Sequence, residues 1–127
     1  MSARDAYRFI NEQDEPTVQS LINRLEFRGK DPAFTQWRDD YLARLRLGSA
    51  ATVLDLGCGT GVVTRALAGR ADFGGRVVGV DQSPMLLEAA RRLAARDDVA
   101  ERTEFQVGNV ERLDLPDATL ARRPGAR

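Results

Sequence analysis

A short apolar segment that runs directly into three alternating glycines constrains the fold of this chain more than any other part of its sequence. Residues 51–56 (ATVLDL) are almost all apolar, as in a strand that is buried on both faces of a parallel sheet. Gly57, Gly59 and Gly61 follow, and glycine allows both a tight turn and a close approach of a ligand to the main chain. Residues 62–71 then carry a helical pattern, whose free N–H groups would face the turn. The sequence therefore predicts a strand–loop–helix unit that binds an anionic or polar group at its loop.

A second apolar run ends in an acidic residue that we expect to face the same site. Residues 77–80 (VVGV) predict another buried strand, and Asp81 follows it, twenty residues after Gly61. Because the carboxyl ends of adjacent parallel strands share one rim, Asp81 would lie beside the glycine loop. A carboxylate in that place can accept hydrogen bonds from the two hydroxyls of a ribose, which indicates a nucleoside-containing ligand. The alternative is that Asp81 only caps the next helix, but Ser83 occupies the more natural capping position.

Two helices are predicted before the first strand. The first begins at Asp14, with a proline in its first turn, and ends at Gly29, which we expect to adopt a left-handed cap conformation. The second begins at Asp31 and ends at Gly48. Its apolar, aromatic-rich face recurs at helical spacing, which favours packing in the core over direct contact with a ligand. The residues of this face are Phe34, Trp37, Tyr41, Leu42 and Leu45.

Four segments of the chain resemble the class I, Rossmann-like methyltransferases that use S-adenosylmethionine. Residues 53–61 (VLDLGCGTG) are similar to the first motif of that family, and residues 78–86 (VGVDQSPML) to its second. Residues 107–113 (VGNVERL) are similar to its third motif, and residues 115–118 (LPDA) to the segment that follows. The first motif is highly specific. The resemblance implies that S-adenosyl-L-methionine is the cofactor.

The resemblance assigns the first motif to the methionine end of the cofactor. Gly57, Gly59 and Gly61 would bring the backbone close to the methionine moiety. Asp55 would help to position the methionine amino group, through water, and would otherwise stabilise the turn.

The second and third motifs are assigned by the same resemblance to the adenosine end. Asp81 would accept hydrogen bonds from both ribose hydroxyls, while Gln82 and Met85 would lie beside the adenine, Met85 as an apolar lid. Asn109, where the family usually has aspartate, would reach the adenine edge, and Val110 would donate a backbone hydrogen bond to it. An amide at this position still offers a carbonyl acceptor to the exocyclic amine.

The resemblance and the alternation of strands and helices predict an α/β fold, a three-layer Rossmann-like parallel sheet preceded by two N-terminal helices. We expect this sheet to be incomplete, with about three strands, since Arg, Pro and Gly fill the end of the chain where apolar strands are due. The predicted domains are a helical segment at 1–49, an incomplete cofactor-binding domain at 50–120 and an irregular tail at 121–127. Without a fourth strand, residues 52–56 would form an exposed sheet edge, open to self-association.

Composition argues against several other functions. Nineteen Lys and Arg balance nineteen Asp and Glu in 127 residues, so the chain lacks the basic surface of a nucleic-acid binder. It contains no histidine, the commonest metal ligand and general base, and we assign neither a metal site nor a catalytic residue. The single cysteine, Cys58, is interpreted as a small buried hydrophobe in a reducing compartment. With no signal peptide and no apolar run long enough to span a membrane, we expect a cytoplasmic protein.

The predicted function is methyl transfer from S-adenosylmethionine to a small-molecule acceptor, and two alternatives stay open. In the first, the chain is a truncated, non-catalytic remnant that keeps the cofactor site or serves as an interaction module, because the acceptor-binding segments of the family would come after the third strand. In the second, less favoured, it is a fragment of an NAD(P)-binding oxidoreductase, whose ribose Asp81 would also suit. Dinucleotide binders favour G-x-G-x-x-G, whereas here the third glycine falls two residues after the second.

Overall fold

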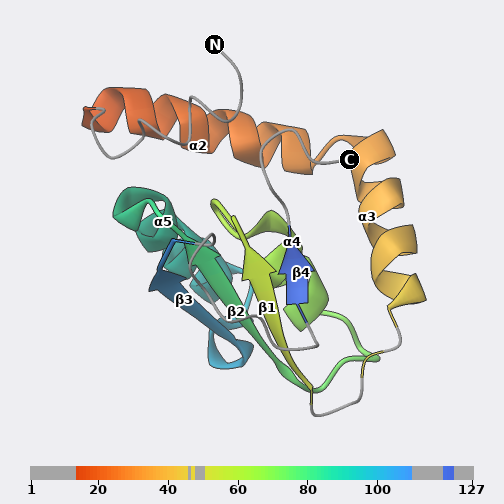
Figure 1. Ribbon diagram of the computed structural model, residues 1–127. Coiled ribbons are helices and arrows are strands. Elements are labelled where there is room, and N and C mark those ends of the chain that lie inside the picture. Colours follow the sequence, from red (N-terminus) through yellow and green to blue (C-terminus); the bar gives the residue numbers. More distant parts are fainter. Residues whose placement is uncertain (1–13, 46, 48–50, 110–118, 122–127) are drawn as a thin grey trace.

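The computed structural model is an α/β fold built on one parallel sheet (Figure 1). It describes residues 14–45, 47, 51–109 and 119–121. The strands lie in the order β3-β2-β1-β4, with bounds Thr52–Leu56 for β1, Arg76–Asp81 for β2, Thr103–Val107 for β3 and Thr119–Ala121 for β4. The helices are α2 (Glu15–Gly29), α3 (Pro32–Arg44), α4 (Val62–Ala68) and α5 (Pro84–Arg96), with a 3₁₀ turn, η2, at Ala100–Arg102. The predicted fold class, a Rossmann-like parallel α/β sheet preceded by two helices, is confirmed.

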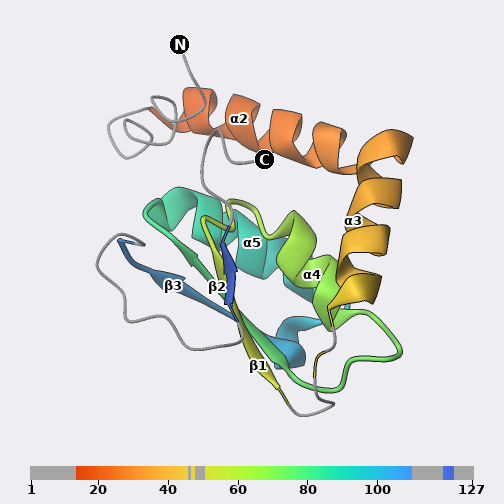
Figure 2. The same cartoon turned by 45° about the vertical axis from the view of Figure 1, so that its right-hand side comes forward.

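Apolar residues hold the layers together on one face of the sheet. The helices α4 and α5 lie side by side on that face, and α2 crosses above the carboxyl ends of the strands (Figures 1 and 2). The main core cluster joins strands and helices through residues that include Val53, Val77, Phe105, Leu67, Leu87 and Ala90. A second cluster, Val18, Ile22, Leu86 and Ala89, fastens α2 to the start of α5.

The edge of β1 that we expected to be exposed is paired with a fourth strand. Residues 54–56 of β1 run parallel to residues 119–121 of β4. The prediction of an exposed edge was wrong because it assumed that a further strand needs a long apolar run. Backbone pairing at a sheet edge needs only a few extended residues, and residues 119–121 provide them before the arginines at 122 and 123. Because this edge of β1 is paired with β4, it gives no support to self-association. β4 also extends to Ala121, one residue beyond the boundary predicted at 120, and residues 122–127 lie outside the described residues.

Three helices begin at the residues that the sequence indicated. The side chains of Asp14, Asp31 and Ser83 each accept a hydrogen bond from the backbone N–H three residues further on, at 2.9, 3.1 and 3.2 Å. A proline follows in the first turn of α2, α3 and α5, where its missing N–H costs no intrahelical hydrogen bond.

Gly29 does not adopt the left-handed conformation predicted for it. It is the last residue of α2, and among the described glycines only Gly57, Gly59 and Gly61 have a positive φ. A Cβ added at Gly29 would lie 2.9 Å from Cγ1 of Val62. Glycine is therefore needed at this position for the close packing of α2 against α4, a contact that no local signal reveals.

The aromatic residues of α3 are not buried in the core as predicted. Trp37 is 52% exposed and Tyr41 is 39% exposed, whereas Phe34 packs at the edge of the main core cluster. The rings of Trp37 and Tyr41 stack on each other with centroids 5.5 Å apart. Of the predicted apolar face, Leu42 is buried and Leu45 packs against the main core cluster, so the core covers only part of that face.

Candidate functional site

The glycine loop between β1 and α4 has the backbone conformation that its sequence predicts. Gly57, Gly59 and Gly61 have φ values of 73°, 58° and 81°, a region that residues with a side chain rarely adopt. The N–H groups of Gly57 and Cys58 donate to the carbonyl oxygen of Val80 at 2.7 and 3.1 Å. The loop is thereby fastened to the end of the neighbouring strand, β2.

Asp81 lies against this loop, at the carboxyl end of β2. Its Oδ2 accepts a hydrogen bond from Gly59 N at 2.9 Å and its Oδ1 accepts one from Ser83 N at 3.0 Å. The residue is 2% exposed. The structure thus brings together the two sequence features that were expected to share one rim. Ser83, and not Asp81, caps α5, because its Oγ accepts from Leu86 N.

Asp55 is fully buried beneath the loop, on β1. Its Oδ2 accepts a hydrogen bond of 2.5 Å from the Thr64 hydroxyl, and Thr64 is itself fully buried on α4. This contact ties the end of β1 to the helix that follows the loop. This contact is consistent with the prediction that Asp55 stabilises the turn. The role of Asp55 toward the methionine amino group stays a prediction.

The residues predicted beside an adenine come to the same rim of the sheet from β2 and β3. Gln82 and Asn109 are exposed, and Met85 is half-buried against the cluster that joins α2 to α5. β3 ends next to β2, with Val107 paired to Asp81, and Gly108 N donates to the carbonyl oxygen of Asp81 at 3.1 Å. Val110 lies outside the described residues.

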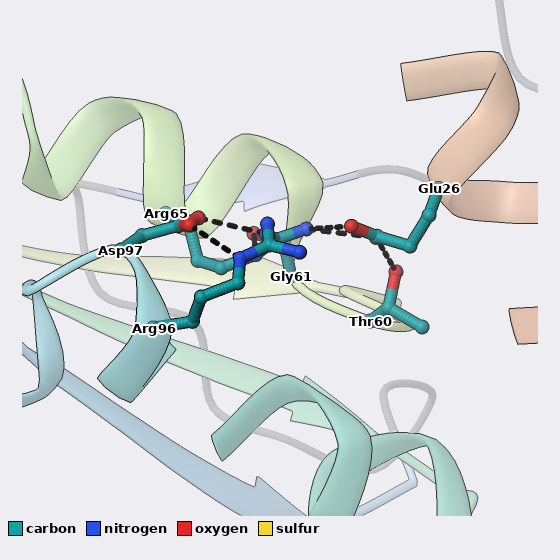
Figure 3. Close-up of polar contacts among 6 residues, drawn as sticks. All are labelled: Glu26, Thr60, Gly61, Arg65, Arg96 and Asp97. Carbon is teal, nitrogen blue, oxygen red and sulfur yellow. Dashed lines mark hydrogen bonds and ion pairs between the residues drawn. The ribbon is translucent and has the colours of Figure 1, made fainter. Parts of the chain in front are cut away.

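A buried ion network behind the loop was missed by the sequence reasoning (Figure 3). The guanidinium of Arg65 donates to both carboxylate oxygens of Glu26 at 2.7 Å and to Oδ2 of Asp97 at 2.8 Å. Its Nε donates to the carbonyl oxygen of Gly61 at 3.2 Å, and the Thr60 hydroxyl donates to Glu26 Oε2 at 2.7 Å. We call Glu26, Thr60, Arg65, Arg96 and Asp97 the loop network.

Opposite charges on two apolar helix faces were the available signal for the loop network. Glu26 falls four residues after the buried Ile22 of α2, and Arg65 falls three residues before the buried Ala68 of α4. The side chains of Arg65 and Glu26 are 7% and 16% exposed. A buried charge of this kind requires a partner. The sequence does not say which residue on another helix supplies it.

The carboxyl group of Asp97 is held in its charged form by the network. Its partial burial acts to raise its pKa, but hydrogen bonds from Arg96 and Arg65, at 3.0 and 2.8 Å, outweigh that effect. The pKa of Asp97 therefore lies below the ordinary value for aspartate.

A cavity of about 230 Å³ lies against the loop network. Its lining includes Gly29, Lys30, Arg38 and Val62 together with Glu26, Arg65, Arg96 and Asp97, and none of the predicted cofactor residues. Among the residues that the structure describes, no cluster of three His, Cys, Asp or Glu could hold a metal ion. None of the described helices is long and apolar enough to span a bilayer.

Comparison with known protein families gives one match that covers most of the sheet. The profile of a family described as a methyltransferase domain matches residues 53–122, which include the glycine loop and Asp81.

Individual relatives match about two thirds of the chain. A demethylmenaquinone methyltransferase of Lactiplantibacillus plantarum is 40% identical over 84 residues, which make up 66% of this chain and 35% of that protein. A trans-aconitate 2-methyltransferase of Paracidovorax citrulli is 48% identical over 81 residues, 63% of this chain and 29% of that protein. The chain thus spans about a third of the length of these two curated relatives.

A solved structure shares the fold as well as sequence. The crystal structure of an RNA methyltransferase from Salinibacter ruber, in complex with S-adenosyl-L-homocysteine, superposes with a TM-score of 0.56 at 31% identity. The superposition covers 68% of this chain and 55% of that one.

Proposed function

The chain belongs to the family of methyltransferase domains, and on that basis we propose that it binds S-adenosyl-L-methionine and serves the transfer of its methyl group to a small-molecule acceptor. The observation that carries the proposal is the contact between Gly59 and Asp81 at the carboxyl rim of the sheet. It brings the glycine loop and a carboxylate within one hydrogen bond of each other.

The residues at this rim fit an adenosyl sulfonium. Gly57 and Gly59 hold left-handed conformations and carry no Cβ atom, which suits close approach of the methionine part. Asp81 would hold the ribose, since a carboxylate accepts hydrogen bonds from neighbouring hydroxyls. Gln82 and Asn109, which are exposed on the same rim, would lie beside the adenine. At Gly61, glycine is also favoured by packing, because an added Cβ would lie 3.0 Å from the Phe105 ring.

The adenine side of the proposed site includes two further residues. Met85 would cover the adenine as an apolar lid, which its position at the start of α5 supports. Val110 would donate its backbone N–H to the ring, a role carried over from the resemblance alone. Asp55, buried below the loop, would act on the methionine amino group through water.

The bound cofactor supplies an electrophilic methyl group, and the work of this chain is to bind and orient it. Methyl transfer is an in-line displacement, so the rate depends on holding donor and acceptor in line and on excluding water. No residue of this chain is proposed as a catalytic acid or base. The proposed contribution of the described residues is a fixed position for the methionine end, set by the glycine loop.

A small-molecule acceptor is favoured over a nucleic acid. Lys and Arg are balanced by Asp and Glu over the chain, whereas a phosphate backbone is bound by a basic surface. The two curated relatives above carry the names of enzymes for small molecules, although the Salinibacter ruber structure is named as an RNA methyltransferase. We propose the cytoplasm as the location, because a chain with a single cysteine cannot form an internal disulfide.

Calorimetric titration of the purified chain with S-adenosyl-L-homocysteine tests the proposal. We expect saturable binding at one site, and no competition from NAD⁺ or NADP⁺. Absence of binding would overturn the proposal, and competition by a nicotinamide dinucleotide would favour the oxidoreductase alternative. A screen for methyl transfer with radiolabelled cofactor then separates an enzyme from a cofactor-binding module, since the module would bind without turnover on any acceptor.

A further inference from the structure

The glycine loop is held by residues of different helices and strands. Asp81, at the end of β2, accepts the N–H of Gly59. Glu26 of α2 accepts the hydroxyl of Thr60, and Arg65 of α4 donates to the carbonyl oxygen of Gly61. Three consecutive loop residues are therefore fixed by three side chains, of which Glu26 comes from α2, 34 positions before Thr60.

Geometry and burial single out Glu26 within this arrangement. Both of its carboxylate oxygens accept hydrogen bonds of 2.7 Å, from Arg65 and Thr60, and its side chain is 16% exposed. Thr60 is 1% exposed. Charge-assisted hydrogen bonds with little access to water are stronger and more directional than exposed ones. The carboxylate of Glu26 thus links the loop to α2 through the Thr60 hydroxyl, and to the Gly61 carbonyl through Arg65 (Figure 3).

The same helix also contacts the other end of the proposed cofactor site. Val18 and Ile22 of α2 pack on Leu86 and Ala89 of α5, and Met85 lies against this cluster. α2 therefore contacts both the loop, through Glu26, and the start of α5, beside which an adenine would lie. A shift of α2 would move both ends of the site together.

We propose that Glu26 is a positioning residue of the cofactor site, which sets the conformation of the glycine loop through Thr60 and Arg65 and makes cofactor affinity depend on the docking of α2. This inference rests on the proposed function, because it takes the loop to be the place where the cofactor binds. By linkage, bound cofactor stabilises the docked position of α2 to the same extent.

The first test compares S-adenosyl-L-homocysteine affinity in three variants of the full chain by calorimetry, at a temperature where thermal unfolding shows each of them to be folded. Glu26→Gln keeps the size of the side chain but removes its charge, and Thr60→Val removes the hydroxyl at nearly constant volume. We expect each to weaken binding about tenfold. The double variant is expected to bind no more weakly than the weaker single variant, because both changes break one contact.

A matched control makes the same chemical change away from the network. Glu101 is an exposed residue of η2, which lies at the opposite end of the sheet from the loop. We expect the Glu101→Gln variant to bind S-adenosyl-L-homocysteine as tightly as the wild type. Variants of Glu26 that lose thermal stability but bind as tightly as the wild type would overturn the inference, since a purely structural role predicts that result. Additive losses in the double variant would overturn the shared contact between Glu26 and Thr60.

A second measurement separates failure of this inference from failure of the proposed function. In the ligand-free protein, the amide resonances of Gly59 and Gly61 are expected to shift in Glu26→Gln and to stay in place in Glu101→Gln. If the wild type does not bind S-adenosyl-L-homocysteine, the proposed function fails, while shifted glycine resonances still support positioning of the loop by Glu26. Unchanged resonances in Glu26→Gln would overturn the positioning role whatever the ligand result.

Discussion

The backbone N–H of Gly59 donates to the carboxylate of Asp81 at 2.9 Å, although the two residues stand 22 positions apart in the chain. This contact closes the rim of the sheet between β1 and β2. It makes Asp81 a support of the loop as well as the proposed ribose acceptor, so the two roles share one side chain.

Replacing Asp81 by asparagine is expected to weaken binding of S-adenosyl-L-homocysteine by about tenfold or more. The amide presents one NH₂ group where the carboxylate has an acceptor, so it opposes either Gly59 N or Ser83 N, each of which now donates to Asp81. Calorimetric titration measures the change. The control is Asp72→Asn, because Asp72 precedes β2 and its side chain is 68% exposed. Equal affinity of Asp81→Asn and Asp72→Asn for S-adenosyl-L-homocysteine would contradict the prediction.

Gly61→Ala is expected to lower the free energy of unfolding by about 1–2 kcal/mol. The φ of Gly61 is 81°, and the added Cβ would lie 3.0 Å from Cε1 of Phe105. Urea unfolding followed by circular dichroism measures the loss. Gly69→Ala serves as the comparison because Gly69 has a φ of −86°; a loss at Gly69 as large as at Gly61 would show that the left-handed conformation is not the cause.

Thr64→Val is expected to destabilise the fold by about 1–3 kcal/mol, because it leaves the buried carboxylate of Asp55 without the hydroxyl that now donates to it at 2.5 Å. Urea unfolding provides the measurement. The matched variant Thr52→Val changes an exposed threonine at the start of β1 and should alter stability by no more than about 0.5 kcal/mol. A Thr64 variant as stable as the wild type would show that the contact contributes nothing net.

Stability should fall on acidification in a way that depends on Asp97. The pKa of this carboxyl is lowered in the folded state, so its contribution is present above the pKa of an unfolded aspartate, about 4, and is lost as the pH falls through the lower folded value. Asp97→Asn should therefore be less stable than the wild type near neutral pH, and the difference should shrink in acid. Urea unfolding over a pH series tests this.

The matched control for acidification is Asp98→Asn, at the exposed neighbour of Asp97. Asp98 has a φ of 59°, a conformation that asparagine also tolerates. Its stability curve should run parallel to that of the wild type. A gap between Asp97→Asn and the wild type that keeps the same size at every pH would rule out the proposed linkage.

The chain has a single tryptophan, so its fluorescence reports directly on α3. Because Trp37 is 52% exposed, its emission is expected near that of tryptophan in water, with efficient quenching by iodide. Unfolding in urea should shift the emission only slightly. A blue-shifted emission that resists iodide would mean that Trp37 is buried in solution and would contradict the surface described for α3.

Helix starts and the glycine loop were predictable because their causes are local. An aspartate or serine followed by proline caps a helix through N–H groups three residues away, as at Asp14, Asp31 and Ser83. Glycines at alternate positions after a buried strand dictate a turn wherever the strand lies. Asp81 could be placed beside that turn because parallel strands align their carboxyl ends.

The burial of side chains and their contacts with other elements were not predictable, because they depend on what lies opposite a residue in space. Trp37 and Tyr41 have the spacing of a buried face, yet the described part of the chain leaves them 52% and 39% exposed. Gly29 has the position of a helix-terminating glycine, yet the structure favours glycine there because Val62 of α4 leaves little room for a Cβ.

The chain alone establishes a parallel α/β unit with a cofactor-type loop, since strand alternation, caps and positive-φ glycines act over a few residues. The pairing of β4 with β1 and the attachment of Glu26 to Thr60 arise only when segments 34 or more positions apart meet. Buried charges and backbone groups must find partners within the folded chain. Which partner each one finds depends on how helices and strands pack, and no stretch of sequence contains that information.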